Sequence, residues 1–147
     1  MSKTSDKILP FFNILLCIGI VGWGSPILYN NRKLYLDENQ CNDYNDELVK
    51  ILFSTIGIGV LGIIYKCFCC GLDKLIYWLY IILGVILLSF NLNFYNKLNS
   101  TCKTFYKSDY SDIWTYYLGS IIYLFLILFI GIINLLKLIY NISYCSK

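Results

Sequence analysis

The chain has 147 residues, of which 58% are hydrophobic and only 14% are charged, and its mean hydropathy is +0.62. A water-soluble domain of this length could not bury so much apolar surface, so the composition predicts an integral membrane protein. The net charge is only +3, no basic patch supports nucleic-acid binding, and histidine, the commonest general base and metal ligand near neutral pH, is absent.

Four apolar runs are long enough to cross a bilayer, since about 20 helical residues span the hydrocarbon core. The predicted spans cover residues 8–29, 49–70, 75–92 and 113–140, with polar outer segments at 30–48 and 93–112. We therefore expect one all-α membrane domain over residues 1–147. Its four transmembrane helices form two antiparallel hairpins, and both termini lie on the same side.

The first run, residues 8–29, follows Lys3 and Lys7 and could belong to a cleaved signal peptide. It is long for that role, and its one small-residue site is followed by Pro26, so a retained helix is the preferred interpretation. Gly19 and Gly22 share a helix face, which favours close helix packing. Pro26 should kink or end the helix near the outer surface.

The segment from residue 30 to 48 is polar and holds a single cysteine, Cys41. Its carboxylates could bind a cation weakly, but they lack the ligand spacing and the glycine of an EF-hand loop. We expect a solvated loop; its acidic residues are Asp37, Glu38, Asp43, Asp46 and Glu47.

The second run carries Thr55, Gly59 and Gly62, which are four and three residues apart and so share one face. Small residues at that spacing let helix backbones approach closely. We expect the first two helices to pack tightly, either within the chain or against a partner.

Cys67, Cys69 and Cys70 lie in the short turn between the second and third runs, and Cys145 follows the fourth run. Metal binding is disfavoured, because no histidine completes a ligand set and the paired CxxC spacing is missing. These cysteines beside a membrane instead suit reversible palmitoylation, with simple packing at a helix end as the alternative.

The segment from residue 93 to 112 also holds one cysteine, Cys102, together with the glycosylation sequon Asn99-Ser100-Thr101. One cysteine in each outer segment predicts a Cys41–Cys102 disulfide in an oxidising compartment. Lysine and arginine counts tie at six on each side and do not set the orientation. The disulfide and the sequon favour cytosolic termini, in the secretory pathway or plasma membrane rather than in an organellar inner membrane.

The helix interiors contain no carboxylate, and their lysines lie near helix ends. Proton relays and ion-coupled transporters need such buried charges, so neither is expected. We expect no enzyme, no cofactor and no metal. The leading hypothesis is an accessory subunit that binds and stabilises or modulates a larger membrane protein. The alternatives are a self-assembled pore lined by Asn13, Ser25, Ser54 and Thr55, or a structural envelope protein.

Overall fold

A computed structural model describes residues 5–36, 40–67 and 73–145, and every regular element in these ranges is a helix. The four long helices are α1 (Ser5–Asn30), α3 (Asn42–Cys67), α4 (Asp73–Lys97) and α6 (Ser111–Cys145). Two short helices, α2 (Lys33–Leu36) and α5 (Ser100–Asp109), lie between them in the sequence. Each long helix contains an apolar stretch able to cross a membrane: Pro10–Asn30, Asn42–Tyr65, Lys74–Lys97 and Ser111–Asn141. The predictions of an all-helical fold and of four helices long and apolar enough to cross a membrane are confirmed, and these four helices indicate an integral multi-pass membrane protein.

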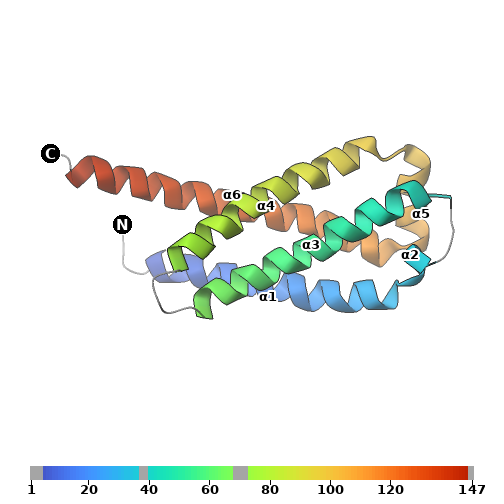
Figure 1. Cartoon of the computed structure of the whole chain (residues 1–147), viewed down its shortest axis with the longest axis horizontal. Helices are drawn as coiled ribbons and strands as arrows, with labels where there is room; N and C mark the ends of the chain where they lie inside the picture. Colours follow the sequence, from blue (N-terminus) through green and yellow to red (C-terminus); the bar gives the residue numbers. More distant parts are fainter. Residues whose placement is uncertain (1–4, 37–39, 68–72, 146–147) are drawn as a thin grey trace.

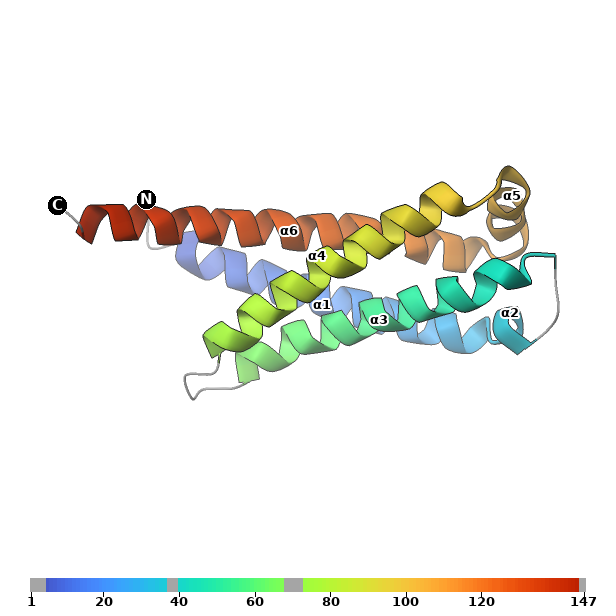
Figure 2. The same ribbon diagram turned by 45° about the horizontal axis from the view of Figure 1, so that its top comes forward.

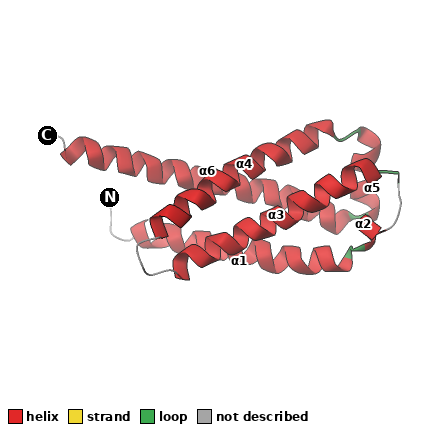
Figure 3. Cartoon of the chain, viewed as in Figure 1, coloured by secondary structure: helices red, strands yellow, loops and turns green. Residues whose placement is uncertain are grey.

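The long helices pack in a closed ring (Figures 1 and 2), in which α1 contacts α3, α3 contacts α4, α4 contacts α6, and α6 returns to α1. The start of α1 and the end of α6 lie at one end of the bundle, which we call the terminal end (Figure 1). The short helices α2 and α5 lie at the opposite end, the capped end (Figure 3). Beyond the ring, the last turns of α6 extend past the other helices.

The segment expected as a loop from residue 93 to 112 is mostly helical. Helix α4 continues to Lys97, and α5 occupies Ser100–Asp109. Asn99 explains the new start: its backbone is extended, with φ −71° and ψ 163°, and its side-chain oxygen accepts a hydrogen bond from Cys102 N at 2.7 Å. Asparagine is among the best N-capping residues, so the polar sequence that resembled a loop begins a helix.

The acidic segment before residue 49 is also partly helical, because α3 begins at Asn42. Asp43 lies in the first turn, where the positive end of the helix dipole stabilises a carboxylate. Asp46 forms an ion pair with Lys50 one turn later, at 2.5 Å. Asp43 and Asp46 are exposed, as expected, but they belong to the start of a helix and not to a loop, whereas Asp37 and Glu38 lie outside the described residues.

Helix α1 does not end at Pro26, as its proline and glycines suggested, but continues to Asn30. Proline removes the backbone N–H that would bond to the carbonyl four residues earlier. The hydroxyl of Ser25 donates to Val21 O at 2.8 Å, and Leu28 is buried after the proline. Packing against the bundle keeps the helix intact, as transmembrane helices with proline commonly are.

The α1–α3 contact uses the small residues predicted on α3. A Cβ added to Gly59 would lie 2.6 Å from a methyl of Ile20, and one added to Gly62 would lie 2.5 Å from Cys17 Sγ. Thr55 on the same face is fully buried, and its hydroxyl donates to Ile51 O. Side chains of α1 therefore fill the space above the glycines of α3.

Gly19 and Gly22 take no part in this contact, so packing against a partner stays a prediction for these two residues. Both are exposed, and a Cβ at either position would meet no described atom within 4 Å. The inward face of α1 follows a different set of positions, spaced four, three and four residues apart: Asn13, Cys17, Ile20 and Gly24. The two glycines thus face away from the bundle.

Replacing Gly59 with alanine should destabilise the bundle by about 1–3 kcal/mol, because the added methyl would overlap Ile20 and Val21 on α1. Gly57→Ala is the matched control, since nothing described lies within 4 Å of its added methyl. It should be neutral or slightly stabilising through helix propensity. Thermal unfolding in one detergent measures both; equal melting temperatures for the two variants would contradict the close approach of α1 to α3.

Candidate functional site

A cluster of hydrogen-bonding side chains from all four long helices lies between the helices, nearer the terminal end than the capped end. We call it the polar core. It consists of Asn13 and Cys17 on α1, Tyr65 on α3, Tyr80 on α4 and Tyr123 on α6. Each of these side chains belongs to a residue that is at most 7% exposed. The bundle therefore encloses a polar interior within segments that are otherwise strongly apolar.

The hydroxyl of Tyr80 is the centre of the polar core. It donates to Asn13 Oδ1 at 3.1 Å, and it lies 3.3 Å from Tyr123 Oη and 3.6 Å from Cys17 Sγ. Cys17 Sγ is in turn 3.4 Å from Tyr123 Oη, so these three groups form a triangle. Asn13 Nδ2 extends the cluster by donating to Tyr65 Oη at 3.5 Å.

Every hydroxyl and thiol hydrogen of these three groups can find a hydrogen-bond acceptor while all three groups are neutral. Once Tyr80 donates to Asn13, the hydrogens of Tyr123 and Cys17 remain, and the triangle offers oxygen and sulfur acceptors for both. The five members of the polar core include neither a carboxylate nor a basic side chain. A neutral, satisfied network of this kind holds the helices in one arrangement.

A second group of polar contacts lies nearer the capped end, six residues from Tyr123 on α6 and eleven residues from Tyr80 on α4. The hydroxyl of Tyr117 donates to Asn91 O at 2.7 Å, and Asn91 Nδ2 donates to Leu87 O at 2.8 Å. The hydroxyl of Tyr116 donates to Ile20 O at 2.9 Å and so joins α6 to α1. Toward the terminal end, Asn134 on α6 donates to the Tyr77 hydroxyl on α4. Polar side chains within the spans thus bond across helices, as expected for packing in a membrane.

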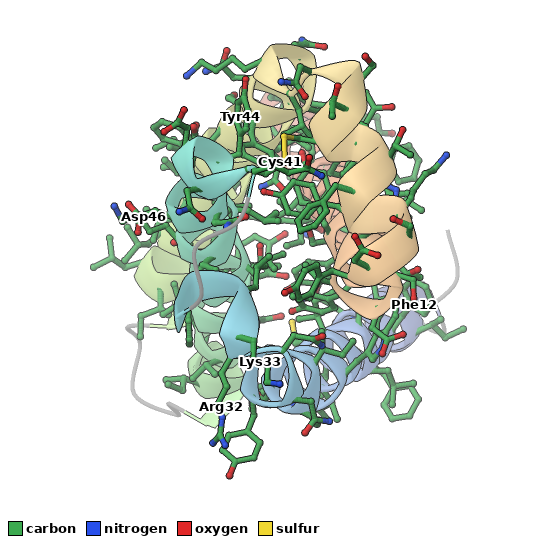
Figure 4. The ribbon with its side chains drawn as sticks, turned by 90° about the vertical axis from the view of Figure 1, so that its right-hand side faces the viewer. Phe12, Arg32, Lys33, Cys41, Tyr44 and Asp46 are labelled. Carbon is green, nitrogen blue, oxygen red and sulfur yellow. A yellow bond between two sulfur atoms is a disulfide. The ribbon has the colours of Figure 1, made fainter. Side chains whose placement is uncertain are left out.

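The capped end is closed by the predicted disulfide. Cys41 and Cys102, 61 residues apart in sequence, are bonded and buried (Figure 4). Beside them, the Tyr106 hydroxyl donates to Asn45 Oδ1 at 2.7 Å. Burial raises the pKa of Tyr106 above its ordinary value, and Tyr44 raises it further, so this hydroxyl remains a hydrogen-bond donor. The disulfide and this bond tie α5 to the start of α3.

The other predicted modification sites are placed less fully. Asn99 of the sequon is exposed, and its side-chain oxygen caps α5. Cys67 and Cys145 are the last residues of α3 and α6. Cys69 and Cys70 lie outside the described residues. Palmitoylation of these cysteines and glycosylation of Asn99 stay predictions.

The outer face of α1 is the remaining candidate site. Around Gly19 and Gly22 it presents the exposed side chains of Leu15, Ile18 and Trp23. No described atom lies within 4 Å of a Cβ added at either glycine, so the helix surface there is a shallow strip that allows another helix to approach closely. We call this strip the α1 outer face.

The polar core escaped sequence reasoning because its tyrosines resemble interface anchors. Tyrosine is usually enriched where a span meets the headgroups. Tyr80 and Tyr123, however, lie well inside their spans, six and twelve residues from the nearer ends of Lys74–Lys97 and Ser111–Asn141. The position of these tyrosines inside the apolar runs, together with the polar residue Asn13 in the first run, could have indicated the polar core.

Comparison with protein-family models, with curated proteins and with solved structures finds no match to this chain. In the ranges that the structure describes, no group of three or more histidine, cysteine or acidic residues could hold a metal ion.

Removing the central hydroxyl with Tyr80→Phe should lower the free energy of unfolding by about 1 kcal/mol, since hydrogen bonds between transmembrane helices average roughly that amount. The loss of stability caused by Tyr80→Phe should be smaller in an Asn13→Val background, because the hydrogen bond between Tyr80 and Asn13 is then already absent. Tyr29→Phe is the control, as Tyr29 is 69% exposed. Thermal unfolding of the wild type, both single variants and the double variant gives the coupling; strictly additive effects would show that the polar core is not a network.

Replacing both Cys41 and Cys102 with serine should destabilise the chain by about 2–4 kcal/mol, because the bond closes a long loop in the unfolded state. The wild-type chain should also migrate differently on a denaturing gel with and without reductant, whereas the double variant should not. An unchanged mobility of the wild type, after alkylation in its native membrane, would mean that the two thiols are not bonded there.

Proposed function

We propose that the chain is a non-catalytic, four-span accessory subunit that binds a larger integral membrane protein or complex and stabilises or modulates it. The α1 outer face is the observation that carries this proposal. Gly19 and Gly22 are exposed, and no other part of the described chain fills the space above them. A glycine inside a helix destabilises it by about 1 kcal/mol relative to alanine. Two glycines that pack against nothing in the described chain therefore favour a role in packing against another protein.

The neutral interior supports the same proposal. The polar core contains phenol, amide and thiol groups that are bonded to one another. An enzyme would need a nucleophile or an acid–base pair in an accessible pocket. Such a bundle is suited to presenting a stable surface to a partner rather than to performing chemistry inside.

The proposed topology has two antiparallel hairpins with both termini in the cytosol. The disulfide at the capped end supports this orientation, because stable disulfides form in oxidising compartments. It also favours the secretory pathway or the plasma membrane over an organellar inner membrane. In this topology Asn99 lies on the side where glycosylation occurs.

A pore is less well supported, because the four residues proposed to line it do not share a face. Asn13 and Thr55 are buried in the bundle and hydrogen-bonded there. Ser25 and Ser54 are exposed. Self-assembly, as a pore or as a structural envelope protein, is therefore an outcome of the test below and not the proposal.

Substituting leucine at both Gly19 and Gly22 should abolish co-purification of the partner, because bulky side chains on the α1 outer face would prevent close helix approach. The variant should fold normally, since both positions are open within the described chain. The measurement is affinity purification from the native membrane in mild detergent, with bound proteins quantified by mass spectrometry.

Gly57→Leu is the matched control, because Gly57 is also an exposed glycine with open space around it, but on α3. It should retain the partner at wild-type stoichiometry. Retention of the partner by the Gly19/Gly22 variant would contradict the assigned face. A wild-type chain that yields only copies of itself would contradict the accessory role.

A further inference from the structure

An open pocket of about 430 Å³ lies at the capped end, between α5 and the residue that precedes Cys41. We call it the α5 pocket. Its lining includes the side chains of Gln40, Ser100, Thr101, Thr104, Phe105 and Ser108. Two outer segments that are far apart in the sequence therefore build one surface feature.

The disulfide holds the two walls of the α5 pocket together. Gln40 directly precedes Cys41, and Thr101 directly precedes Cys102, so each wall is one residue away from the bond. Both cysteines are buried. Because covalent closure fixes the walls in advance, a ligand can bind here without ordering the backbone first.

The polar side chains of the α5 pocket have unused hydrogen-bonding capacity. Those of Gln40, Ser100 and Thr101 have no hydrogen-bond partner among the described residues. The hydroxyls of Thr104 and Ser108 donate to backbone carbonyls of α5, but their oxygens can still accept. The pocket therefore offers both donors and acceptors to a ligand.

The rest of the lining adds a carboxylate, from Asp109, and an aromatic ring, from Phe105. A ligand that carries many hydroxyl groups and also presents an apolar C–H face would use this combination, and a sugar ring has both features. Along α5 the lining extends over nine residues from Ser100, about 14 Å. The pocket thus has room for one or two sugar rings and not for a long chain.

Asn99 can supply such a sugar. It begins the sequon Asn99-Ser100-Thr101, and the other two residues of the sequon line the pocket. Asn99 Oδ1 accepts the hydrogen bond from Cys102 N, whereas Nδ2, the atom that carries an N-linked glycan, has no partner in the part of the chain that the structure describes. Capping and glycosylation use different atoms of one side chain and are compatible.

We propose that Asn99 carries an N-linked glycan whose first sugars lie in the α5 pocket and form part of the capped end. The linkage forms when the Asn99 amide nitrogen attacks the anomeric carbon of an oligosaccharide carried on a lipid pyrophosphate. The new C–N bond replaces the C–O bond to the pyrophosphate, one amide proton goes to the released lipid pyrophosphate, and no atom is oxidised or reduced. The proposal rests on the proposed orientation of the capped end and is independent of the partner at the α1 outer face.

The presence of the glycan is tested on the full-length chain from its native membrane. Peptide N-glycosidase F should increase the mobility of the wild type on a denaturing gel. Asn99→Gln should lack this change. Asn141→Gln is the matched control, because Asn141 begins the second sequon, Asn141-Ile142-Ser143, near the end of α6, and this variant should keep the change.

An unchanged mobility of the wild type would overturn the proposal. A mobility change that is lost only in Asn141→Gln would also overturn it, because the terminal end would then face the glycosylating compartment. Neither result depends on the Gly19/Gly22 purification, so this proposal and the accessory role can fail separately.

The place of the sugars is tested by filling the α5 pocket with Thr104→Trp. Thr115→Trp is the matched control, because both threonines are exposed and both hydroxyls donate to the carbonyl four residues earlier. Enzymatic removal of the glycan from the folded wild type should lower its melting temperature by about 2–4 °C. Thr115→Trp should show the same decrease, whereas Thr104→Trp should lose most of it, because the tryptophan already excludes the sugars.

The enzyme converts Asn99 to aspartate in all three chains, so this conversion does not account for a difference between them. Amide hydrogen exchange of the wild type is a second measurement that needs no variant: the α5 amides should exchange more slowly with the glycan than without it. An equal decrease in melting temperature for the two tryptophan variants would overturn the placement of the sugars. Exchange of α5 that does not respond to the glycan would overturn it as well.

Discussion

A polar group inside a bilayer must find its hydrogen-bond partner within the protein, and this constraint organises the bundle. The Tyr80 hydroxyl satisfies it by meeting groups on α1 and α6, and Asn13 carries the network on to Tyr65 on α3. Once Asn13 and Cys17 face inward, helix geometry turns Gly19 and Gly22 outward. The same network that unites the four helices thus exposes the small-residue strip on which the proposed function depends.

The two ends of the molecule differ in how they are built around this core. At the capped end, the disulfide and the Tyr106–Asn45 bond join α5 to α3 and fix one outer segment against the other. At the terminal end, the last turns of α6 extend beyond the ring (Figure 2).

Sequence reasoning succeeded where one physical effect dominates. The four spans follow from apolar length, the Cys41–Cys102 pair from one cysteine per outer segment, and the packing role of Gly59 from small-residue spacing. It left open what depends on several helices acting together. Gly19 and Gly22 have the same spacing logic as Gly59, but the direction of a helix face depends on which side chains bond in the core. Helix α5 was missed because its polar composition resembles a loop, although Asn99 provides a strong N-cap.

The stoichiometry of the complex released from the native membrane tests the accessory role most directly. Native mass spectrometry of the tagged wild-type chain in mild detergent should detect it bound to one larger membrane protein in a fixed ratio. The intact mass should also show the chain two hydrogens lighter than its fully reduced form, as the disulfide requires. A chain recovered only alone, or only as multiples of its own mass, would contradict the accessory role and favour a structural or pore-forming assembly.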